Sequence, residues 1–89
     1  MPERAVRIVN EAGIHARPAA EIVKTAAKFA TDVYIVRDDL DVNAKSIMGV
    51  MMLAAGVGTE VTLETNGERE EEAMDALLHL IADRFGEGE

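Results

Sequence analysis

The chain has 89 residues, of which 48% are hydrophobic and 29% charged, the balance of a folded globular protein with one modest core. It contains no cysteine, which excludes disulfides, thiolate metal sites and cysteine nucleophiles. The formal net charge of -8 arises entirely in residues 60–89, because residues 1–59 carry seven basic and seven acidic side chains. Such an acidic balance argues against nucleic acid as a partner.

The N-terminal half of the chain is predicted to form a strand, a helix and a hairpin. Polar and apolar residues alternate from Arg4 to Val9, as in a strand with one buried face. Apolar residues then recur at helical spacing from Ala16 to Ala30. The β-branched and aromatic run Asp32–Val36 predicts a second strand, and a turn at Arg37–Asp39 leads into a third strand around Leu40–Val42.

The C-terminal half is predicted to add a short helix, a strand and a long helix. The short apolar helix runs from Ile47 to about Leu53, with Gly56 and Gly58 as its stop signals. Alternation from Thr59 to Thr65 predicts the fourth strand, and an Asn-Gly turn leads to a helix over Glu70–Phe85 with an acidic first turn.

The element order is therefore β-α-β-β-α-β-α, which places the chain in the α+β class. Helices with one apolar stripe need a sheet face to cover, and four strands with one apolar face each supply it. We expect a four-stranded, largely antiparallel sheet covered on one side by helices. No internal repeat or linker interrupts the chain, so residues 1–89 are expected to form a single, monomeric domain.

The compartment is expected to be the cytoplasm. The N-terminus shows no basic, apolar and cleavable signal pattern. The longest apolar run, Ile47–Val57, is shorter than the roughly 20 residues needed to cross a bilayer, so no membrane insertion is expected.

A histidine stands where a loop enters the first long helix. We expect His15 at or beside the helix N-cap, next to the N–H groups of Ala16 and Arg17, since the first amides of a helix have no acceptor within it. This position favours anions and a neutral, nucleophilic imidazole. The Arg17 guanidinium can bind phosphate in a forked geometry. A histidine near a helix start can equally be structural or merely exposed, and the spacing alone leaves these alternatives open.

Two segments resemble the HPr family, the histidine-containing phosphocarriers of the bacterial phosphotransferase system. The segment Gly13-Ile14-His15-Ala16-Arg17-Pro18-Ala19 is similar to the active-site signature of that family. The segment from Asn43 to Met51 is similar to its regulatory-serine segment, at the family's spacing. Ile14 stands where the family usually has leucine, which is a conservative change.

The resemblance implies an open-faced β-sandwich without a cofactor. It implies that His15 accepts a phosphoryl group through Nδ1 from a phosphohistidine of enzyme I, itself charged by phosphoenolpyruvate. His15 then passes the group to a histidine of an enzyme IIA domain, and Arg17 stabilises the charge in transit. In this interpretation the protein is a transfer intermediate in sugar uptake rather than an autonomous enzyme.

Ser46 is predicted first as the N-cap of the short helix. By the resemblance it is also a phosphorylation site for HPr kinase/phosphorylase. A phosphate there would add about two negative charges beside the surface that meets enzyme I. A transcriptional regulator is the expected partner of that phosphorylated form.

The short helix carries more apolar surface than it can bury. Val50 and Leu53 are assigned to the core, and the exposed remainder is expected to form a docking patch, because methionine side chains adapt to several partners. Two lysines are expected to frame this patch and to steer acidic partners. The residues predicted to contact partners are Pro18, Lys24, Lys45, Ile47, Met48 and Met51.

No metal site is expected. The segment from Asp39 to Asn43 mimics the start of an EF-hand loop, but Ala44 and Val50 stand where that loop requires glycine and glutamate. His79 falls on the polar face of the last helix and is expected to be solvated.

Two alternative functions stay open. The chain could be the nitrogen-related paralogue, which feeds regulatory targets instead of sugar permeases. It could also be a regulatory binding module that acts through phosphorylated Ser46 and a transcription factor. Members devoted to that role are expected to lack the active histidine, whereas His15 is present.

Overall fold

The computed structural model describes residues 2–86 and confirms the predicted order of elements. The strands are β1 (Glu3–Arg7), β2 (Asp32–Arg37), β3 (Leu40–Asn43) and β4 (Glu60–Asn66). The helices are α1 (Ala16–Ala27), α2 (Ile47–Met52) and α3 (Glu70–Ala82), followed by the 3-10 turn η1 (Arg84–Gly86). The sheet has the strand order β1-β4-β2-β3, and each adjacent pair is antiparallel.

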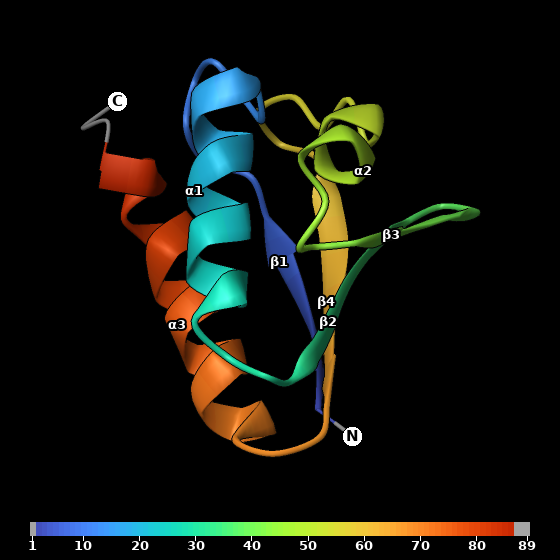
Figure 1. The fold of residues 1–89 in the computed structure, drawn as a ribbon. Helices are drawn as coiled ribbons and strands as arrows, with labels where there is room; N and C mark the ends of the chain where they lie inside the picture. The colour runs from blue at the N-terminus through green and yellow to red at the C-terminus, as the bar shows by residue number, and fades with distance from the viewer. Residues whose placement is uncertain (1, 87–89) are drawn as a thin grey trace.

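The fold has two layers, with α1 and α3 side by side over one face of the sheet (Figure 1). No helix within residues 2–86 covers the other face of the sheet, and α2 lies beside the N-terminal half of α1 (Figure 1). The period-two alternation of β2 and β4 sends Val33, Ile35, Val61 and Leu63 into the core. They pack with the apolar faces of the long helices, where each fully buried large side chain contributes about 1.5–3 kcal/mol.

The strand β1 and the helix α1 end earlier than predicted. The strand β1 stops at Arg7, and Val9 is exposed rather than part of it. The helix α1 stops at Ala27 instead of Ala30, because the amides of Lys28 and Phe29 bond to carbonyls three residues back and tighten the last turn.

The helix α3 stops at Ala82, although its periodicity extends to Phe85. Arg84 and Phe85 have positive φ angles of 54° and 56°, which no α-helix accommodates. Phe85 is nevertheless buried, as its place in the apolar pattern predicted.

The helix α2 ends close to the predicted Leu53, but no glycine acts as its stop signal. The helix ends at Met52, and Ala54 takes the left-handed conformation, φ 49°, that glycine usually supplies at this place. Its amide bonds to the carbonyl of Met51 at 3.1 Å.

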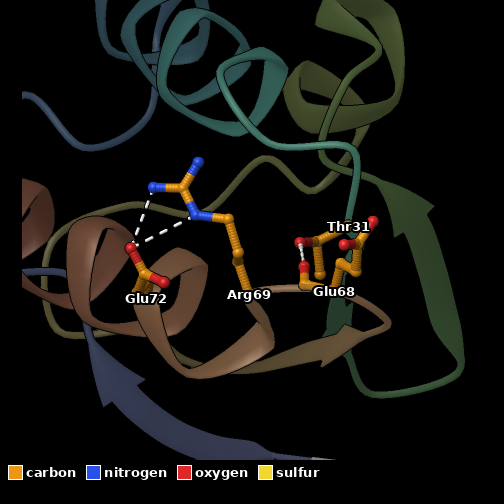
Figure 2. Close-up of polar contacts among 4 residues, drawn as sticks. All are labelled: Thr31, Glu68, Arg69 and Glu72. Carbon is orange, nitrogen blue, oxygen red and sulfur yellow. Dashed lines mark hydrogen bonds and ion pairs between the residues drawn. The ribbon is translucent and has the colours of Figure 1, made fainter.

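The start of α3 is tied to the loop that follows α1 (Figure 2). The Thr31 hydroxyl donates a hydrogen bond to the carbonyl of Glu68. Arg69, the N-cap of α3 with φ 60°, bonds through its guanidinium to the Glu72 carboxylate at 2.8 and 3.2 Å. It also lies 5.0 Å from the centre of the Phe29 ring. The hydrogen bond and the charge of Arg69 lower the pKa of Glu72.

Candidate functional site

His15 is the N-cap of α1, as predicted. Its backbone is extended, with φ -106° and ψ -165°, and its carbonyl accepts the amide of Ala19 at 3.0 Å. The side chain is exposed. The imidazole is therefore accessible to another protein at the positive end of a 12-residue helix.

The first turn of α1 contains the other residues of the signature. Ala16 and Arg17 occupy its first two positions, so their amides lie at the open end of the helix. Pro18 occupies the third position, where a proline loses no helical hydrogen bond. Pro18 is buried, which leaves it little surface for contact with a partner.

The loop before His15 is held by neighbouring backbone. Gly13 has φ +69°, and a β-carbon there would lie 2.7 Å from the Ala55 carbonyl oxygen and 2.8 Å from the Cα of Gly56. The Ile14 amide bonds to the same Ala55 oxygen at 2.8 Å. The buried Asn10 donates through Nδ2 to the Gly13 carbonyl at 2.8 Å. The sequence indicated only a turn here, and the supporting segment lies about 40 residues further along.

The exposed Arg17 side chain extends toward the C-terminal turn. A β-carbon on Gly86, in η1, would lie 3.8 Å from Nη2 of Arg17. The Arg17 guanidinium therefore lies near η1, at the N-terminal end of α1.

Ser46 is the N-cap of α2, as predicted, and its hydroxyl oxygen accepts the Gly49 amide at 3.1 Å. Val50 and Leu53 are buried, which confirms their assignment to the core. The opposite side of α2 is apolar and exposed: Ile47 at 46%, Met48 at 78%, Met51 at 44% and Met52 at 63%.

The two lysines predicted to frame this surface differ in their environments. Lys24 is exposed, and its ammonium lies 3.5 Å from the Glu21 carboxylate, a separation and exposure at which an ion pair contributes little. Lys45 is half-buried and donates through Nζ to the carbonyl of Phe29 at 2.8 Å. The Lys45 ammonium therefore lies at the C-terminal end of α1, where a positive charge is favourable.

Within residues 2–86, no group of three or more His, Cys, Asp or Glu side chains is placed to hold a metal ion. None of the helices in this part of the chain combines the length and apolar character needed to cross a membrane. His79 is exposed near the C-terminal, negative end of α3, whereas His15 lies at the N-terminal, positive end of α1.

The family model described as "PTS HPr component phosphorylation site" matches residues 2–83. The chain belongs to the HPr family of phosphocarriers. It is 57% identical over 89 residues to the phosphocarrier protein HPr of Cupriavidus necator, with all of both chains covered. It is also 47% identical over 81 residues to the HPr-like protein Crh of Halalkalibacterium halodurans, which covers 91% of this chain and 96% of that protein.

A solved structure of an HPr-family member has the same architecture. The crystal structure of HPr-C-His from Thermoanaerobacter tengcongensis superposes with a TM-score of 0.94 at 48% identity, over 98% of each chain. The open-faced β-sandwich expected from the resemblance is thus confirmed.

Proposed function

We propose that this HPr-family protein carries a phosphoryl group on His15, which it takes from phospho-enzyme I and gives to enzyme IIA domains. The observation that carries the proposal is the place of His15: an exposed imidazole at the N-cap of α1. That place combines an accessible nucleophile with the anion-binding end of a helix.

The transfer itself exchanges one phosphorus–nitrogen bond for another. The lone pair on Nδ1 of neutral His15 attacks phosphorus, and the bond to the enzyme I histidine breaks with its electron pair returning to that nitrogen. Such transfer depends on positioning and on electrostatic stabilisation of the phosphoryl oxygens. The amide of Ala16 and the guanidinium of Arg17 are the groups of this chain nearest in sequence to supply it.

We infer that enzyme I and the IIA domains dock on a surface made by Ile47, Met48 and Met51 of α2 together with Lys24 of α1. The three apolar side chains are exposed, whereas Val50 on the other side of the same helix is buried. Lys24 places an exposed positive charge on the adjoining helix, which suits acidic partners. We leave Pro18 and Lys45 out of the proposed surface, because Pro18 is buried and the Lys45 ammonium bonds to the carbonyl of Phe29.

The surface is tested with Met48→Ala, because Met48 is the most exposed of its residues. This variant is expected to raise the KM for enzyme I about fivefold, since loss of a well-packed contact residue weakens association by about 1 kcal/mol. Val57→Ala removes an exposed apolar side chain outside α2 and serves as the matched control. Equal KM values for the two variants would remove α2 from the interface.

The carrier role is tested by incubating the chain with enzyme I and phosphoenolpyruvate and measuring its intact mass before and after mild acid. We expect one added, acid-labile phosphate, which His15→Ala abolishes and His79→Ala leaves in place. No transfer from an active enzyme I would contradict the proposal. The HPr-like fold would then serve in binding or regulation, which is the regulatory-module alternative that the sequence leaves open.

We also propose that phosphorylation of Ser46 by a protein kinase weakens docking of enzyme I. Ser46 is exposed and directly precedes Ile47 of the docking surface, so a phosphate would place its charges beside that surface. Ser46→Asp is expected to raise the KM for enzyme I, and Ser46→Ala to leave it near the wild-type value. Identical KM values in the two variants would contradict this regulation. The whole relay is proposed to operate in the cytoplasm.

A further inference from the structure

Arg37 links the β2–β3 hairpin to the C-terminal end of α2. It is the last residue of β2 and half-buried, and its Nη1 donates to the carbonyl of Leu53 at 2.5 Å and to that of Ala54 at 3.0 Å. The last carbonyls of a helix accept no hydrogen bond from an amide of the same helix. A donor from outside the helix therefore stabilises them. Bonds from a guanidinium are stronger than bonds from a neutral donor.

The residues that follow these two carbonyls support the loop that presents His15. The carbonyl of Ala55 accepts the Ile14 amide at 2.8 Å, and the backbone of Gly13 lies directly on Ala55 and Gly56. Ala55 itself is buried. A continuous path of bonds therefore runs from the Arg37 guanidinium through Ala54 and Ala55 to Ile14, the residue before His15.

The far end of the same segment is held by separate contacts, which include a bond from the Gly58 amide to the carbonyl of Ile8 at 2.7 Å. Nη1 of Arg7 donates to the carbonyl of Gly58 at 2.9 Å. The Arg7 side chain is 63% exposed and bonds to one carbonyl, whereas Arg37 is half-buried and bonds to two. Arg37 thus holds the start of this segment, next to Ala55, together with the burial of Leu53 and Ala55.

We propose that Arg37 is a positioning residue for His15. By fixing the carbonyls of Leu53 and Ala54, it holds Ala55 against Ile14 and so sets the backbone from which the imidazole is presented. The consequence for phosphoryl transfer rests on the proposed carrier function, because small displacements of a reacting group slow transfer strongly. The effect on the loop itself does not depend on that function.

The test compares Arg37→Met, Arg37→Lys and Arg69→Met in the full chain. Arg69→Met is the matched control, because it also removes a guanidinium with two bonds, at the opposite end of α1. The readouts are amide exchange of Ile14 relative to Leu63 of the central strand β4, the ring resonances of His15, and transfer from phospho-enzyme I. Leu63 corrects for any general loss of stability, since it is fully buried in the sheet.

In Arg37→Met we expect the Ile14 amide to exchange about tenfold faster relative to Leu63, equivalent to about 1.4 kcal/mol. The His15 ring resonances should shift and transfer should slow mainly through kcat. Arg37→Lys, which keeps the charge and one donor group, should restore part of each effect. Arg69→Met should change none of them.

An unchanged ratio of Ile14 to Leu63 exchange in Arg37→Met would overturn the proposal, as would equal changes in Arg69→Met. If Arg37→Met does not fold, Arg37→Lys carries the same test, with a smaller rise in the ratio expected. Failure of wild-type protein to accept phosphate would refute the carrier function instead. The exchange ratio and the His15 resonances would still decide whether Arg37 positions the loop.

Discussion

Replacing Gly13 by alanine should be among the most damaging single-methyl changes in this chain. The left-handed conformation of Gly13, φ +69°, costs about 1–2 kcal/mol for a residue with a β-carbon. That β-carbon would also lie 2.7 Å from the backbone oxygen of Ala55. Neither atom can move without a shift of the backbone, and such overpacking costs about 1–3 kcal/mol. The free energy of unfolding should therefore fall by about 2–5 kcal/mol.

Two other glycines separate these contributions. Gly58 has φ +85° but no atom within 4 Å of its β-carbon position, so Gly58→Ala should lose only the conformational part, about 1–2 kcal/mol. Gly56 has neither a positive φ nor a close neighbour, so Gly56→Ala should stay within about 0.5 kcal/mol of wild type.

Thermal unfolding followed by circular dichroism measures all three variants. A domain of this size loses roughly 4–8 °C in Tm per kcal/mol, so Gly13→Ala should melt at least about 8 °C below wild type. It should also accept phosphate from enzyme I more slowly, because the displaced backbone carries His15. A Gly13→Ala variant that melts no lower than Gly58→Ala would refute the argument that Ala55 and Gly56 confine this loop.

Three smaller changes test other parts of the structure. Ser46→Ala should lower the free energy of unfolding by about 1 kcal/mol through loss of the N-cap, while Ser46→Asp keeps it; equal urea midpoints for the two would contradict the cap. Ala54→Gly should raise the free energy of unfolding by about 1 kcal/mol, because glycine removes the penalty of φ 49°, and a lower urea midpoint would count against this account. Arg69 lowers the pKa of Glu72 in the folded protein, so the stabilisation from this exposed pair is present at neutral pH and is lost as the pH falls through that lowered pKa. An NMR titration of Glu72 should therefore show a higher pKa in Arg69→Met or at high salt, and an unchanged titration would contradict the pairing.

The features that could be predicted from the sequence depend on residues close together in the chain. His15 was placed at the start of α1 from the turn, the proline and the apolar periodicity that follow one another in a single stretch. Ser46 was recognised as an N-cap for the same reason, since it directly precedes an apolar run. The period-two alternation located β4 and its buried face correctly, whereas β1 contains no buried residue.

The features that escaped prediction depend on residues far apart in the chain. Arg37 bonds to the carbonyls of Leu53 and Ala54, 16 and 17 residues further along the chain, and Ala54 rather than a glycine takes the left-handed conformation after α2. Gly13 was read only as a turn, because the carbonyl that confines it belongs to Ala55. Lys45 was expected to face partners, yet its ammonium bonds to the carbonyl of Phe29. No spacing rule in one sequence specifies such contacts.

The central claim is that the phosphoryl group is carried by His15 at the start of α1. Long-range proton–nitrogen NMR of the chain phosphorylated by enzyme I tests it most directly, because this chain has only two histidines. We expect phosphorylation to shift Nδ1 of His15 and the amides of Ala16 and Arg17, while the ring of His79 stays unchanged. A phosphorylated His79, or a phosphorylated His15 without any change at the first-turn amides, would contradict the account.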